Sequence, residues 1–170
     1  MIFDFYPWKL EVDIDKTKEL YIKNNYAIDK KTNEEFVNQL SDKQMDFFLS
    51  LGVNPMKIEI DKKVYDIPDE KDLTGGRIQR IAVNFIFCGK FLVIPEFQKD
   101  LYEDDKLFGN NIPSSLKVIS LPKDEYLVTY NIDNIGCGIV FKHPCSFNGK
   151  EFTTWDCGYV KGSILIMTDL

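Results

Sequence analysis

The chain has 170 residues, of which 44% are apolar and 14% aromatic, and its formal net charge is −6. This composition argues against intrinsic disorder and suffices for one hydrophobic core, so we expect a single domain over 1–170. Nucleic acid is not expected as a partner, because the only arginines are Arg77 and Arg80 and phosphate binding needs clustered basic side chains. An acidic chain would instead attract a basic protein.

No window of the sequence approaches the roughly 20 apolar residues that a membrane span needs. Residues 1–8 also lack the basic and apolar segments of a secretion signal, so we expect a cytoplasmic protein without a membrane partner. In that compartment the four cysteines are expected as free thiols. The sequence indicates no oligomeric state.

The N-terminal third, 1–54, is predicted to be helical after one opening strand. A helix over 13–22 has an acidic cap, which we assign to Asp15, because a carboxylate can accept the free amides of a first turn. Two capping boxes predict two further short helices, and Gly52 predicts where the second of them ends. Each box pairs a hydroxyl residue with a Glu or Gln three positions later: Thr32 with Glu35, and Ser41 with Gln44.

The remainder, 55–170, is predicted to be rich in strands. A hairpin is expected around the polar turn 61–63, and 81–87 alternates as a strand with one buried face does. Residues 88–90 predict a turn into a partner strand, and a short helix is expected after Pro95. The strand segments are 56–60, 64–67, 81–87, 91–94, 116–121, 126–132, 138–142 and 163–167.

This order of elements predicts an α+β fold, in which short N-terminal helices pack on a mainly antiparallel β-sheet. The segment 70–76 interrupts the periodicity with charged residues and two glycines. Each side of this segment would have a thin core by itself, so we interpret it as a loop inside one domain.

Three of the four cysteines lie near the only histidine of the chain. Cys137, His143, Cys145 and Cys157 contain the ligand set of a structural Cys₃His zinc site. Zinc ribbons usually carry Cys-x-x-Cys pairs, and none is present. The alternative is that these cysteines are small buried residues that pack in the sheet, and we favour packing. Zinc is the only cofactor that the sequence suggests.

The same residues allow a thiol-dependent enzyme. A nucleophilic cysteine needs a base, and His143 is the only imidazole. Cys145 is too close in sequence to face His143 easily across Pro144, whereas Cys157 or Cys88 could be brought beside it by the sheet. No local signature of a thiol enzyme surrounds any of them.

Carboxylates are frequent and offer a further alternative, a carboxylate-dependent enzyme or a site for a hard cation. Asp13 and Asp15 would share one face of an extended segment, but a role as a helix cap explains them better. A second acidic group lies at the end of the helix expected after Pro95, and we interpret it as a solvated, partner-binding surface. This group contains Asp100, Glu103, Asp104 and Asp105.

Aromatic residues crowd the C-terminal thirty positions. An Asn-Gly turn signal lies at 148–149, so Phe147 and Trp155 are predicted near the tip of a hairpin. Exposed aromatic rings beside acidic side chains are typical of a protein-binding surface. We therefore expect a non-catalytic binding or inhibitory module of the immunity or antitoxin kind. The alternatives are a structural zinc protein and a thiol- or carboxylate-dependent enzyme.

Overall fold

The computed structural model describes residues 1–24, 29–66, 76–103, 116–119, 128–152 and 157–169. Of residues 66 and 100–103 it describes the backbone alone. In chain order the elements are β1 (Ile2–Phe5), β2 (Trp8–Val12), α1 (Ile14–Lys23), α2 (Lys30–Val37), α3 (Asp42–Ser50), the 3₁₀ turn η1 (Pro55–Lys57), β3 (Glu59–Asp66), β4 (Arg77–Pro95), α4 (Glu96–Glu103), β5 (Lys117–Ile119), β6 (Ile139–Lys142), β7 (Ser146–Phe147), β8 (Lys150–Glu151) and β9 (Tyr159–Asp169).

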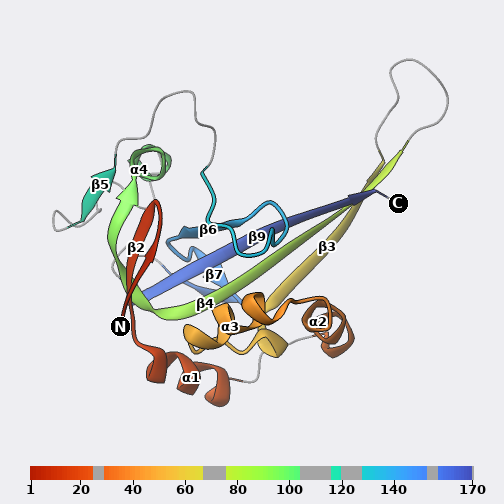
Figure 1. The fold of residues 1–170 in the computed structure, drawn as a ribbon, viewed down its shortest axis with the longest axis horizontal. Helices are drawn as coiled ribbons and strands as arrows, with labels where there is room; N and C mark the ends of the chain where they lie inside the picture. Colours follow the sequence, from red (N-terminus) through yellow and green to blue (C-terminus); the bar gives the residue numbers. More distant parts are fainter. Residues whose placement is uncertain (25–28, 67–75, 104–115, 120–127, 153–156, 170) are drawn as a thin grey trace.

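The fold is α+β, as the sequence predicts. A seven-stranded sheet runs in the order β1-β2-β4-β9-β6, and β3 and β5 also pair with β4. All these pairings are antiparallel except that of β4 with β5. Figure 1 shows α1, α2 and α3 along one side of the long β4–β9 pair, with α4 at the far end of β4. The described helices include none that is long and apolar enough to cross a membrane.

Strand β4 is the centre of the sheet, and it corrects two predicted turns. Residues 61–63 lie within β3, which pairs with β4 over its whole length, so the predicted turn there is wrong. The polar side chains of residues 61–63 are exposed to solvent, so the strand can continue through them. The predicted turn at 88–90 is also wrong, since β4 continues from its pairing with β9 into its pairing with β2. A Cβ at Gly89 would collide with the carbonyl oxygen of Glu11, so glycine at this position lets β4 lie close to β2.

The helix starts confirm one capping box and correct the other. Helix α3 is capped by Ser41, whose hydroxyl accepts from the amide of Gln44 at 3.3 Å, while the amide of Ser41 donates to the Gln44 side chain at 2.9 Å. Its last turn ends at Gly52, as predicted. Helix α2 is capped by Asp29, so the box predicted at Thr32 is wrong: the Thr32 hydroxyl donates to the Asp29 carboxylate at 2.7 Å.

The N-cap of the first helix lies two residues before the predicted cap, Asp15. Asp13 is the N-cap of α1, and its side chain accepts from the amide of Lys16 at 3.1 Å. Asp15 lies inside the first turn, where a carboxylate also favours the positive end of the helix dipole. The cap is therefore acidic, as expected, but it is Asp13.

The core is formed mainly by aromatic rings between α3 and the sheet. Phe48 is fully buried, and its ring centroid lies 5.1 Å from that of Phe85 on β4. Phe47 contacts both rings from the same helix. On β9, Gly162 lies beside the Phe85 ring and leaves space for it. This contact fixes which face of the sheet the helices cover.

The chain opens with a hairpin, β1–β2, where the sequence predicted one strand. Trp8 at the start of β2 is fully buried and donates from Nε1 to the side chain of Gln98 on α4 at 2.6 Å. Gln98 in turn donates to the carbonyl of Phe141 on β6 at 2.8 Å. One buried amide therefore connects the opening hairpin, the helix after Pro95 and the sheet.

The C-terminal strand predictions are confirmed in part. The helix after Pro95 is α4, and β5, β6 and β9 lie within or across the predicted segments. Of the segment 126–132, residues 126–127 lie outside the described chain. Tyr130 forms an isolated bridge with Ile139.

Candidate functional site

The structure separates the predicted zinc ligands. The amide of Cys137 donates to the carbonyl of Leu165 at 2.8 Å, whereas His143 follows Lys142, which pairs with Lys161. Four residues of β9 separate these two levels, a distance of about 13 Å along an extended strand. Cys137 is exposed there, at one end of β6, and His143 is buried at the other.

His143 and Cys157 are brought together. The Sγ atom of Cys157 lies 3.8 Å from Nδ1 of His143 and 3.7 Å from the carbonyl oxygen of Tyr159. The imidazole is only 1% exposed, while Cys157 is half-buried. Cys145 is exposed, and its carbonyl accepts from the amide of Phe152 at 3.0 Å. The sheet thus forms the Cys157–His143 contact that sequence spacing allowed.

A metal site needs more ligands than this pair supplies. Structural zinc is almost always bound by four ligands in a tetrahedron. Within the described residues, no group of three or more His, Cys, Asp or Glu side chains is arranged to hold a metal ion. The four residues predicted as a zinc site therefore do not form one ligand set here. The packing that the sequence favoured for these cysteines is also wrong for Cys137 and Cys145, because both are exposed.

Two lysines next to this pair were not singled out from the sequence. Lys142 and Lys161 lie opposite each other in the β6–β9 register, on the sheet face away from α3. Lys161 donates to the carbonyl of Ser146 at 3.0 Å and lies 3.6 Å from the carboxylate of Glu59. Burial, followed by the charge of Lys161, holds the pKa of Lys142 below its usual value. Only the strand register, which the sequence does not contain, reveals this pair.

The predicted partner-binding residues fall mostly outside the described side chains. Asp100 and Glu103 lie on α4 with their backbone alone described, and Asp104, Asp105 and Trp155 lie outside the described residues. The segments outside the description hold eight acidic residues and three lysines, a net charge of −5 out of −6. The sequence therefore concentrates its excess acidity in these segments.

Phe147 corrects part of the aromatic prediction. The Asn-Gly turn is present, with φ angles of 47° at Asn148 and 76° at Gly149 that match the turn of a two-residue hairpin. The Phe147 ring, however, is only 3% exposed. It faces β9, with Nζ of Lys161 6.0 Å from the ring centroid. Phe147 is thus part of the packing and does not present its ring to a partner.

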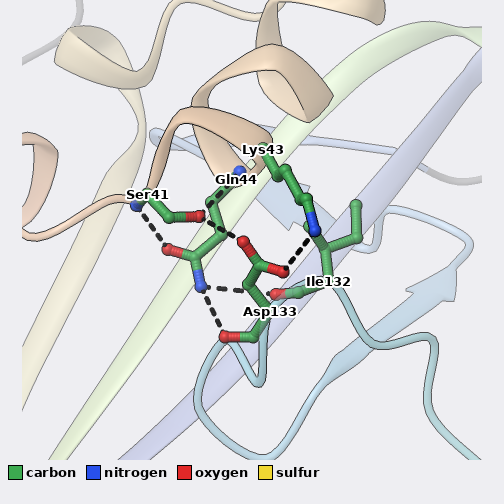
Figure 2. Close-up of polar contacts among 5 residues, drawn as sticks. All are labelled: Ser41, Lys43, Gln44, Ile132 and Asp133. Carbon is green, nitrogen blue, oxygen red and sulfur yellow. Dashed lines mark hydrogen bonds and ion pairs between the residues drawn. The ribbon is translucent and has the colours of Figure 1, made fainter.

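A polar contact between α3 and the loop before β6 holds the helix layer against the sheet. Figure 2 shows Asp133 accepting from the Ser41 hydroxyl at 2.8 Å, with Lys43 3.5 Å away. The Gln44 amide donates to the carbonyls of Ile132 and Asp133 at 3.3 and 3.0 Å. Asp133 has a φ of 46°, a left-handed conformation that such contacts stabilise. Ser41 also caps α3, and its hydroxyl donates to Asp133, so we interpret the role of this cluster as structural.

The strongest candidate for a binding surface is a groove between α1 and α3. It has a volume of about 320 Å³, and Ile22 and Leu49 are 76% and 53% exposed beside it. The groove is lined by Lys18, Tyr21, Ile22, Leu49, Gly52, Val53, Asn54 and Lys57. The sequence signal for this groove is that Ile22 and Leu49 are apolar residues on helix faces that the buried stripe does not need.

A second hollow, of about 520 Å³, lies between the start of α1 and the β2–β4 pair. Among the described residues, three carboxylates line it, and two of them are paired: Glu11 contacts Lys90 at 2.9 Å, and Asp13 contacts Lys16 at 3.3 Å, while Asp15 is the third. These pairs leave it a mixed, charged depression, less suited to an apolar ligand than the α1–α3 groove is.

Comparison of the chain with protein-family models, with curated proteins and with solved structures finds no match. The function must therefore be argued from the geometry alone.

Proposed function

We propose that this protein is a non-catalytic binding or inhibitory module, of the immunity or antitoxin kind, that docks a basic partner protein through the α1–α3 groove. The observation that carries the proposal is the exposure of Ile22 and Leu49 on either side of this groove. Contiguous exposed apolar surface is disfavoured on a protein that binds nothing. Apolar side chains of the partner would fill the groove.

The composition of the lining favours binding over chemistry. Among the residues that line the groove, none is a His, Cys, Asp or Glu, and its titratable side chains are Lys18, Tyr21 and Lys57. Two of these are engaged with the backbone, since the Tyr21 hydroxyl donates to the carbonyl of Ile86 at 2.9 Å and Lys57 is bound as well. Lys57 donates to the carbonyl of Tyr21 at 2.6 Å, and its aliphatic stem adds to the apolar wall. A surface of this kind recognises shape and apolar area.

The charge of the chain supports a basic partner. A net charge of −6 would attract a positively charged protein over long range, and short-range contact would then follow in the apolar groove. Asp100, Glu103, Asp104 and Asp105 are the densest acidic group in the sequence and would contribute to this steering.

The groove is tested by capture on immobilised chain from a lysate of the source cells, with elution by increasing salt. Leu49→Asp should abolish retention of a basic protein that the wild type retains, because a carboxylate in the apolar wall must be desolvated. Met167→Asp is the matched control, since Met167 is 48% exposed and lies near the end of β9, away from the helices. Retention by Leu49→Asp, equal loss in the control, or no capture at low salt would contradict the proposal.

The charge contribution is tested separately. Replacing the four acidic residues at 100 and 103–105 by Asn or Gln should lower the salt concentration at which the partner elutes, because screening weakens exposed charges. An unchanged elution position would show that this group does not steer the partner. A second copy of this chain could fill the groove instead, and sedimentation of the purified chain tests this. In that case the wild type is a dimer, Leu49→Asp converts it to a monomer, and the proposal of a basic partner is wrong.

A further inference from the structure

The geometry points to a second, independent property: Cys157 is a reactive thiol, activated by His143, that small hydroperoxides oxidise to a sulfenic acid. Nothing in the groove proposal requires this, because the pair lies at the end of β6 and the start of β9. The inference rests on the placement of one thiol against the only imidazole of the chain.

The contact has the layout of an activated nucleophile. Nδ1 of His143 lies 3.8 Å from Sγ of Cys157, within hydrogen-bonding reach of a sulfur atom. The thiol proton also has the Tyr159 carbonyl within 3.7 Å, but a carbonyl cannot remove the proton, whereas an imidazole can. The base is buried and the thiol is half-buried, so His143 is held in place while Cys157 can meet a small reagent.

The other cysteines differ from Cys157 in informative ways. Cys137 and Cys145 are exposed, so accessibility alone would make them the most reactive. Cys88 is buried, and burial raises the pKa of its thiol, which opposes formation of a thiolate. Exposure therefore predicts an order of reactivity in which Cys157 is third, whereas the imidazole contact predicts that it is first.

The chemical step is balanced with a hydroperoxide as the oxidant. His143 accepts the thiol proton, and the resulting thiolate attacks the terminal oxygen of the hydroperoxide. An S–O bond forms as the O–O bond breaks, sulfur loses two electrons and the peroxide oxygens gain them. The leaving alkoxide, or hydroxide from hydrogen peroxide, takes the proton from the imidazolium, which leaves a sulfenic acid and an alcohol or water. Because His143 is buried, its positive charge arises only beside the thiolate that balances it.

The activation is tested by alkylation with iodoacetamide at pH 7, with the rate at each cysteine measured by mass spectrometry. An ordinary thiol with a pKa of about 8.5 is only about 3% thiolate at pH 7, so an activated one should react about tenfold faster. We expect Cys157 to react about tenfold faster than Cys137, and His143→Gln to remove this excess without changing Cys137. A Cys157 rate below that of Cys137 in the wild type would overturn the proposal.

Cys88 is only 8% exposed in the folded chain, so a rise in its labelling rate reports that a variant has opened the core. If His143→Gln exposes Cys88, the wild-type pH profile decides instead. Alkylation of Cys157 should then level off at a lower pH than alkylation of Cys137, since its thiolate forms earlier. Parallel profiles for the two residues would refute the activation.

The oxidation step has its own readout. After one equivalent of hydrogen peroxide, dimedone should label the wild type at Cys157. The variant Cys157→Ser should show no comparable labelling at any cysteine. Labelling that follows exposure, with Cys137 and Cys145 modified first, or no labelling at all, would show that Cys157 is not the oxidised residue.

Discussion

Single residues decide how charge is distributed on the sheet face away from α3. Lys142 and Lys161 lie directly opposite each other, and only Lys161 has described polar partners. A partly buried ammonium next to another cation is unfavourable, which is why the pKa of Lys142 is lowered. This residue therefore costs stability at neutral pH.

Lys142→Met should stabilise the protein most at pH 7 and progressively less toward pH 10. Between the lowered pKa of folded Lys142 and the ordinary value of 10.5, the unfolded chain binds more protons than the folded chain. The free energy of unfolding of the wild type therefore rises with pH across this window, and the variant lacks that rise. Urea unfolding at pH 7.0, 8.5 and 10.0 measures the difference.

The exposed Lys9, replaced by Met, is the control for this comparison, because its side chain is not desolvated on folding. A stability difference between Lys142→Met and the wild type that does not vary with pH would contradict the assigned cause.

At the level of elements, β4 is the strand that other parts of the fold share. It pairs with β3, β9, β2 and β5 in turn along its length. Two glycines make this possible, Gly89 on β4 itself and Gly162 on β9, because each allows a close approach that a side chain would block. Both positions resemble turn or weak-strand signals in the sequence.

Gly162→Ala should destabilise the protein by about 1–3 kcal/mol, the usual cost of overpacking a core. The added Cβ would collide with the Phe85 ring, which is fully buried against Phe47 and Phe48 and has no space to move. The change in the free energy of unfolding is measured by urea denaturation.

Gly76→Ala is the matched control, because a Cβ at Gly76 would meet nothing within 4 Å. Its effect should stay within about 0.5 kcal/mol. Equal effects of the two substitutions would show that loss of glycine itself, and not the contact with Phe85, is responsible.

Across the whole molecule, parts distant in sequence are joined by polar contacts as well as by the aromatic core. The core cluster includes residues from the helical third and from the β-rich remainder. Gln98 connects Trp8 and Phe141 in the interior, whereas the connection from α3 to Asp133 in Figure 2 lies at the surface. These contacts fix the helices and the opening hairpin on the sheet.

Gln98→Met should lower the free energy of unfolding by about 1–3 kcal/mol, because it leaves the Trp8 indole N–H and the Phe141 carbonyl buried without their present partner. Gln39→Met, at an exposed position, controls for the change of side chain. Thermal unfolding followed by circular dichroism measures both. An effect of Gln98→Met no larger than that of the control would show that the connection does not contribute to stability.

The candidate surfaces show how far local sequence signals reach. The groove needs Ile22 and Leu49 on two different helices, and the thiol pair needs Cys157 to return beside His143. Spacing along the chain allowed the second contact but did not select it over Cys88. The expected exposure of Phe147 was wrong because the hairpin packs against β9, a contact between elements that the turn signal does not contain.

The sequence by itself determined the α+β class, the cap of α3, the end of that helix at Gly52 and the Asn-Gly turn, because each depends on residues a few positions apart. Tertiary structure decided the continuous β4, the burial of Phe147, the opposition of Lys142 and Lys161 and the contact between Cys157 and His143. These features depend on strand register, and one residue of register moves every side chain to the other face of the sheet.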